Sequence, residues 1–96
     1  MSLTTEQAAI KKELGVIMEL AYEKTMTTRA DVFVTYMGHV NGLNVRIFNK
    51  GWHSALGEGT EQITPSYTAE FYLVGTGAPS NVPAELAKII RKLQEL

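Results

Sequence analysis

The alternation of apolar and polar residues is clearest between residues 31 and 50, in the segment DVFVTYMGHVNGLNVRIFNK. A period of two is typical of strands with one buried face, and Asn41-Gly42 in the middle is the strongest short-range signal for a hairpin turn. A type I′ turn needs positive φ at both central residues, which Asn tolerates and Gly adopts freely. The pattern therefore predicts two antiparallel strands joined at Asn41-Gly42.

A two-residue turn also predicts the register, because the pairs can be counted outward from it. Tyr36, for example, is then opposite Ile47. This register sorts the side chains into a first face, predicted to be the core face, and a second face of mixed character. The first face holds Val32, Val34, Tyr36, Val40, Leu43, Val45 and Ile47, and the second holds Phe33, Thr35, Met37, His39, Asn44, Arg46, Phe48 and Lys50.

Helical periodicity marks both ends of the chain. Residues 4 to about 27 predict a long helix, because Thr4 and Gln7 match a capping box and apolar residues then recur at helical spacing. A second amphipathic helix is predicted to begin between Ser80 and Pro83. Gly15 lies at the edge of the first apolar stripe, where close packing is one reason for a glycine. The stripes are Ile10, Leu14, Ile17, Met18 and Ala21, widened by Val16, Leu20 and Tyr22, and, in the second helix, Leu86, Ile89, Ile90 and Leu93.

A third strand is predicted at Tyr67 to Val74, with Glu70 on its solvent side because an unpaired carboxylate is costly to bury. Before it, residues 51–65 are rich in glycine and lack periodicity, which predicts a long loop with a short edge strand at Glu61 to Thr64. We therefore expect one α+β domain, residues 1–96, of order α-β-β-β-α, with a three-stranded antiparallel meander and two helices packed on one face.

Composition narrows the classes of function. The formal net charge of −1 lacks the basic excess usual in proteins that bind duplex nucleic acid. The absence of cysteine excludes disulfides and thiolate metal sites, and the start of the chain lacks a signal-peptide pattern. No apolar run approaches the roughly 18–20 residues of a membrane span, so we expect a cytoplasmic protein without membrane contact.

The second face of the sheet is the candidate binding surface, because an apolar patch on a protein surface usually binds something. Its predicted contact residues are Phe33, Met37, His39, Arg46, Phe48 and Tyr72. Three occupants are open: the 51–65 loop with Trp52 folding back over it, a second copy of the chain, and single-stranded nucleic acid stacking on Phe33 and Phe48.

Catalytic and metal chemistry find little support in the sequence. His39 and His53 are the two histidines, and no HxH or HExxH spacing accompanies them. A small hydrolase built on His53, Ser54 and Glu58 is a further alternative, but no GxSxG motif surrounds Ser54. We therefore predict no catalytic residues, no metal site and no cofactor, and retain Trp52 and His53 as binding candidates in the loop.

The element order is also that of double-stranded-RNA-binding domains, and Gly38-His39 falls where those domains carry a glycine-histidine loop. Their last helix begins with a lysine cluster that contacts phosphates, whereas this chain has the sequence NVPAE at residues 81–85. Without those donors the activity is not carried over.

A second resemblance covers residues 31–52, where DVFVTY and GHVNGLNVRIFNKGW resemble a motif of small uncharacterised proteins encoded by phages and prophages of Gram-positive bacteria. The resemblance implies an accessory phage protein that works through contacts, and it brings no catalytic residues. The leading hypothesis is thus a non-enzymatic, self-associating interaction module that uses the second sheet face or the long first helix. Binding of single-stranded nucleic acid is the alternative.

Overall fold

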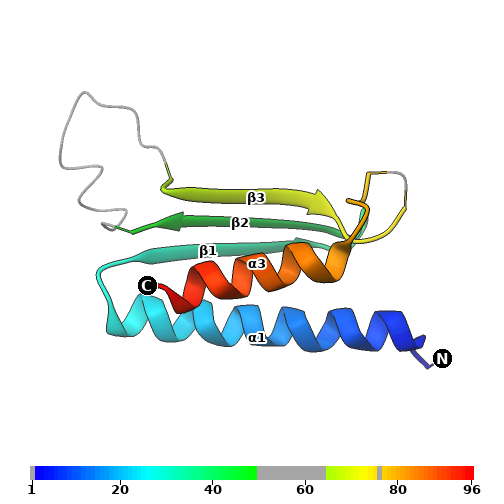
Figure 1. Ribbon diagram of the computed structural model, residues 1–96, viewed down its shortest axis with the longest axis horizontal. Helices are drawn as coiled ribbons and strands as arrows, with labels where there is room; N and C mark the ends of the chain where they lie inside the picture. The colour runs from blue at the N-terminus through cyan, green and yellow to red at the C-terminus, as the bar shows by residue number, and fades with distance from the viewer. Residues whose placement is uncertain (1, 50–64, 76) are drawn as a thin grey trace.

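The computed structural model describes residues 2–49, 65–75 and 77–96. Within these ranges the order is helix α1 (Thr5–Thr27), strands β1 (Asp31–Met37), β2 (Gly42–Phe48) and β3 (Tyr67–Tyr72), and helix α3 (Val82–Gln94). The strands form an antiparallel sheet in the order β1-β2-β3, and both helices lie on the same side of it (Figure 1). The predicted α+β fold is confirmed. The predicted short strand at Glu61 to Thr64 lies outside the described residues.

Helix α1 begins at the predicted capping box. The Thr4 hydroxyl accepts a hydrogen bond from the Gln7 N–H at 3.1 Å, and the Gln7 side-chain oxygen accepts one from the Thr4 N–H at 3.0 Å. At the other end, the N–H of Thr28 still donates to the Lys24 carbonyl, and the Thr28 hydroxyl accepts from the Ala30 N–H. These bonds satisfy groups left unpaired at a helix end and turn the chain into β1.

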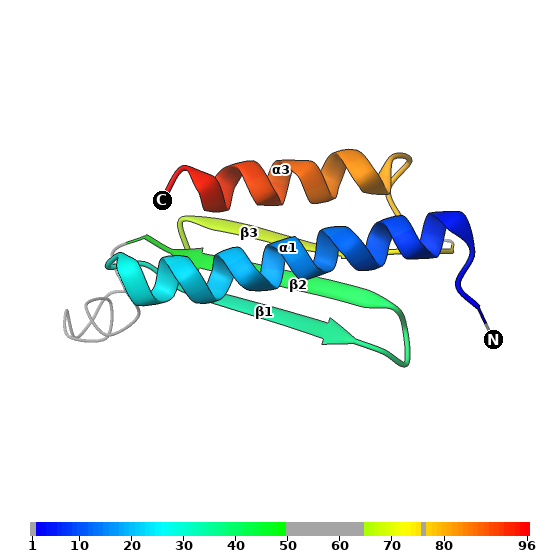
Figure 2. The ribbon, with the colours of Figure 1, turned by 90° about the horizontal axis from the view of Figure 1, so that it is seen from below.

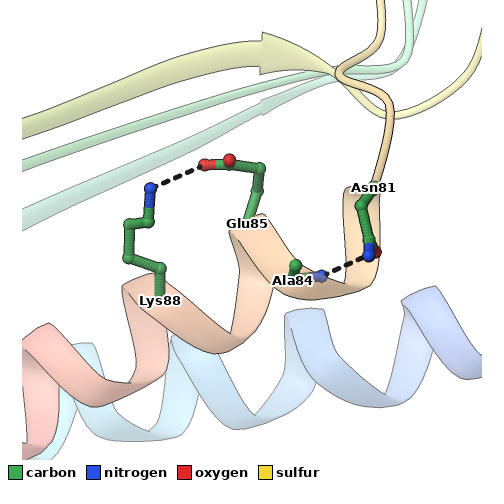
Figure 3. A network of polar contacts seen from close by, with 4 residues as sticks. All are labelled: Asn81, Ala84, Glu85 and Lys88. Carbon is green, nitrogen blue, oxygen red and sulfur yellow. Dashed lines mark hydrogen bonds and ion pairs between the residues drawn. The ribbon is translucent and has the colours of Figure 1, made fainter.

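Helix α3 begins within the predicted range. The Asn81 side-chain oxygen accepts a hydrogen bond from the Ala84 N–H at 3.1 Å (Figure 3). One turn later, the Lys88 Nζ lies 3.7 Å from the Glu85 Oε2 and forms an ion pair with it. The cap fixes where the helix starts. The ion pair is exposed to solvent and adds little to stability.

The core lies between the first sheet face and the two helices. Both helices run along the sheet, α3 on the β3 side and α1 nearer β1 (Figure 2). The largest fully buried side chains come from α1, β2 and α3: Ile17, Leu43, Val45, Leu86, Ile89 and Leu93. The middle strand is thus buried under both helices, as expected for a sheet covered on one side.

The predicted apolar stripe of α1 is only partly correct. Ile10, Ile17 and Ala21 are buried, but Met18 is 54 % exposed and Tyr22 71 % exposed. These two residues lie beside the buried stripe on the helix surface, outside the part of that surface that packs in the core. Close packing does not explain Gly15 either, because a Cβ built there meets no heavy atom within 4 Å.

The predicted hairpin turn and register are wrong. Tyr36 pairs with Leu43 and not with Ile47, and the last pair of the hairpin is Met37 with Gly42. A four-residue loop, residues 38–41, replaces the two-residue turn, and Asn41 alone takes the positive φ, at 54°. Val40 consequently leaves the strand and is 41 % exposed.

Three contacts account for the longer loop. The Asn41 carbonyl accepts from the Leu73 N–H at 2.8 Å, which ties the loop to the end of β3, and the Tyr36 hydroxyl donates to the Asn41 side chain. Gly42 lies in β2, where a Cβ would stand 3.1 Å from the terminal methyl of Met37. Gly42 therefore lies in a strand, beside the Met37 side chain, and is not a turn residue.

The error leaves the two faces unchanged. Each β1 residue pairs with a residue four positions away from its predicted partner, and an even displacement keeps every side chain on its side of the sheet. Leu43, Val45 and Ile47 are buried on the first face as predicted.

Substitutions at residues 41 and 42 distinguish the observed loop from a type I′ turn. We expect Asn41→Val to lower the free energy of unfolding by roughly 1–3 kcal/mol, because a β-branched residue is strained at positive φ. Gly42→Ala should have the smaller effect, because its Cβ meets the movable end of the Met37 side chain. Chemical denaturation of both variants measures the difference, and a larger loss for Gly42→Ala contradicts the observed loop.

Candidate functional site

The second sheet face carries four cross-strand rows of different character. The β1–β2–β3 register aligns Met37, Gly42 and Tyr72 in one row, Thr35, Asn44 and Glu70 in the next, and Phe33, Arg46 and Thr68 in a third, with Asp31 beside Phe48 at the end. The predicted contact residues therefore fall into two clusters separated by a polar row.

The first cluster is Phe33, Arg46 and Phe48. The rings of Phe33 and Phe48 meet edge to face, with centroids 5.6 Å apart, and the Arg46 guanidinium carbon lies 5.2 Å from the Phe33 centroid. Phe48 is only 5 % exposed, while Phe33 is 36 % exposed. An edge-to-face pair and a cation–π contact each stabilise the fold by about 1 kcal/mol, so these side chains serve first to pack the sheet.

The second cluster is Met37 and Tyr72, which face each other across Gly42. The Tyr72 ring also covers Gly77, where a Cβ would come within 2.0 Å of it, so a glycine is required there. Tyr72 remains 46 % exposed. His39 lies in the loop between β1 and β2 and is exposed, apart from both clusters.

The polar row between the clusters limits what the second face can bind. The Asn44 side-chain amide donates to the Glu70 carboxylate at 3.2 Å, near the middle of the face. That carboxylate repels phosphate, and Phe33 is the only member of the Phe33–Phe48 pair with a substantially exposed ring. Within the described residues, the second face thus offers two small apolar contacts and not one continuous patch.

A larger apolar surface lies on the side of the molecule formed by α1 and β1. We define the α1/β1 flank as Met18, Tyr22 and Met26 of α1 with Val32, Val34 and Tyr36 of β1. The three α1 residues are spaced by four, so they follow one side of the helix. They are 54 %, 71 % and 63 % exposed, and Tyr36 is 51 % exposed. Met18, Tyr22 and Met26 border a groove of about 370 Å³ whose other wall is the start of β1.

The leading hypothesis from the sequence includes the long first helix as a contact surface, but it does not identify this flank, because Met18 and Tyr22 are predicted to lie in the apolar stripe that packs in the core. The signal was present: the apolar residues of α1 cover more of the helix circumference than one packed layer can bury. Met26 was not assigned to either set.

The backbone of β1 adds polar groups to the flank. The Val32 N–H donates a hydrogen bond to the Thr25 hydroxyl at 3.3 Å, so it points away from β2. Ile47 lies opposite Val32, and its carbonyl accepts a hydrogen bond from the Ser66 N–H on the β3 side. Val32 and Ile47 are therefore a non-hydrogen-bonded pair. Because these pairs alternate along an antiparallel ladder, the N–H and C=O groups of Val34 and Tyr36 also point away from β2.

The described ranges contain few groups suited to metal binding. No group of three or more His, Asp or Glu side chains that could hold a metal ion occurs there. Neither described helix is both long and apolar enough to span a membrane. The loop candidates Trp52 and His53, and the alternative set His53, Ser54 and Glu58, lie outside the described residues.

Comparison with protein-family models, with curated proteins and with solved structures gave no match to this chain. The function is therefore inferred from the surfaces described above.

The hydroxyl of Tyr67, in β3, is expected to make the free energy of unfolding depend on pH. Burial raises the pKa of Tyr67 above its ordinary value of 10.0, the charge of Glu85 raises it further, and Arg91 lowers it. A raised pKa means that the folded state disfavours the ionised form. This contribution to stability is complete below the unfolded-state pKa and is lost as the pH rises through the folded-state pKa.

We expect the unfolding free energy of the native protein, relative to that of Tyr67→Phe, to fall as the pH is raised through this range. Chemical denaturation at successive pH values measures the difference, and Tyr22→Phe at an exposed site is the matched control. A difference between the native protein and Tyr67→Phe that stays constant with pH contradicts the assignment.

Proposed function

We propose that this protein is a non-enzymatic interaction module that self-associates through the α1/β1 flank. The observation that carries the proposal is the row of exposed apolar side chains along α1 beside an edge strand. Exposed apolar side chains occur singly on most soluble proteins, but a continuous set of this kind marks a contact surface.

The size of the flank supports an interface. Taking about 200 Å² for a fully exposed side chain of this size, Met18, Tyr22, Met26 and Tyr36 expose on the order of 500 Å². A standard interface buries about 800 Å² on each partner. The exposed backbone of β1 and the half-buried Val32 and Val34 supply part of the remainder.

The composition of the flank also supports an interface. Tyr and Met are enriched at the buried centres of interfaces, where charged residues other than arginine are depleted. Met18, Tyr22 and Met26 follow one side of the helix at a spacing of four, and Thr25 between them and β1 is uncharged. The residues that line the groove between α1 and β1 carry no charge, so two copies can approach along the groove without burying an unpaired charge there.

We propose that this module acts in the biology of a phage or prophage. The resemblance of residues 31–52 alone supports this role. A small module that acts by contacts fits the accessory role that the resemblance implies.

Tyr22→Lys tests the proposed surface. Tyr22 is largely exposed, so the variant should fold normally, while a charge within the interface should disfavour association by several kcal/mol. We expect sedimentation equilibrium to show a dimer for the native protein and a monomer for Tyr22→Lys. Thr27→Lys is the matched control, because it adds the same charge to an exposed position near the end of α1 but outside the flank.

A monomeric native protein at all accessible concentrations refutes self-association. A dimer that survives Tyr22→Lys as well as Thr27→Lys places the interface elsewhere on the molecule.

A further inference from the structure

We infer that two copies of this chain pair their β1 strands antiparallel, about a two-fold axis at Thr35, and so form one continuous sheet with the described helices on one side. This inference rests on the proposed self-association and adds its geometry: the strand that pairs, the register of the pairing, and the helices that meet.

The composition of the two sheet edges identifies β1 as the paired one. Natural proteins protect open edges with charged residues, prolines or bulges. Strand β3 carries Glu70 near its centre, whereas residues 32–37 of β1, VFVTYM, contain neither a charge nor a proline. Uncharged segments of about six residues with high strand propensity aggregate when they remain open, so β1 is the edge that requires a partner strand.

The outward-pointing backbone groups select the register. Val34 and Tyr36 direct their N–H and C=O groups away from β2, while the N–H of Val32 already donates to Thr25. A two-fold axis at Thr35 pairs Val34 of each copy with Tyr36 of the other, which makes four hydrogen bonds in all. A two-fold axis at Val34 would instead require the N–H of Val32, so the axis at Thr35 is favoured.

The same register is complementary in its side chains. On the second face it sets Thr35 opposite Thr35 and Phe33 opposite Met37 of the second copy. Pairs of threonines and pairs of an aromatic with an apolar residue are favourable across antiparallel strands. No like charges meet in this pairing, because the central residues of β1 carry none.

The inclination of α1 to β1 provides space for the second copy. The two elements diverge, so that the last turns of α1 lie near the start of β1 while its first turns lie far from the end of β1 (Figure 2). A groove of about 380 Å³ opens there, bordered by Leu14, Tyr36 and Val74 among others. Antiparallel pairing brings the end of one β1 beside the start of the other, so Tyr22 and Met26 of the second copy reach the groove next to Tyr36.

Gly15 fits this arrangement. It lies on the exposed side of α1 between Lys11 and Met18, and nothing within the described part of the chain occupies the space of its missing side chain. A glycine in a helix interior is destabilising unless something else benefits from it. In the paired arrangement this open position lies on the side of α1 that faces the second copy.

Cysteine cross-linking tests the register, because the chain contains no cysteine of its own. Thr35→Cys places one thiol opposite its own copy in a non-hydrogen-bonded pair, whose Cα separation of about 4.5 Å is within the range of a disulfide. Thr68→Cys is the matched control, an exposed threonine on the same sheet face but on β3. Under mild oxidation we expect Thr35→Cys to form the covalent dimer roughly tenfold faster or more, because pairing holds its thiols at high effective concentration.

A second pair of variants provides a test that requires no oxidation. Thr35→Lys sets two like charges directly opposite each other and should shift the native dimer to monomer in sedimentation equilibrium, while Thr68→Lys should not. If the native protein is a dimer, equal cross-linking of the two cysteine variants together with an intact Thr35→Lys dimer overturns the register and leaves self-association standing. A monomeric native protein overturns both.

Discussion

Burial of one sheet face beneath two helices is the constraint on which the rest of this structure depends. The middle strand β2 supplies Leu43, Val45 and Ile47 to the core, and α3 supplies Leu86, Ile89 and Leu93. A sheet of three strands with its described helices on one side has a first face covered by those helices, a second face opposite them, and two edges. The surfaces available for function follow directly from this arrangement.

Those surfaces are not equivalent. The second face is divided by the Thr35–Asn44–Glu70 row, and its aromatic cluster is largely packed, with Phe48 buried. The edge at β3 carries Glu70. The edge at β1 combines an uncharged strand, outward-pointing backbone groups at Val34 and Tyr36, and the exposed side of α1. Among the described residues, the α1/β1 flank thus combines outward-pointing backbone groups with a row of exposed apolar side chains, as in recognition at a sheet edge.

Much of the fold could be predicted because local patterns agreed with the tertiary packing. The capping box at Thr4 forms as predicted, and the apolar spacing of α3 and the alternation of β2 each describe a buried set that the structure contains. The faces of the hairpin were also correct although its register was not, because a displacement of four residues preserves the alternation.

The errors arose where a residue's role depends on distant parts of the chain. Asn41-Gly42 has the composition of a type I′ turn, but the bond from Leu73 to the Asn41 carbonyl and the packing of Met37 and Tyr72 about Gly42 favour a longer loop. Met18 and Tyr22 have helical spacing, yet their burial depends on where β1 lies relative to α1. Sequence periodicity shows which residues of a helix are apolar, but not which of them another layer covers.

Amide hydrogen exchange at single-residue resolution, measured over a range of protein concentrations, tests most directly whether the edge of β1 is paired with a second copy. We predict that the amides of Val34 and Tyr36 become protected as the concentration rises, while those of Thr68 and Glu70, which point outward from β3, continue to exchange quickly. Rapid exchange of Val34 and Tyr36 at every concentration would contradict it.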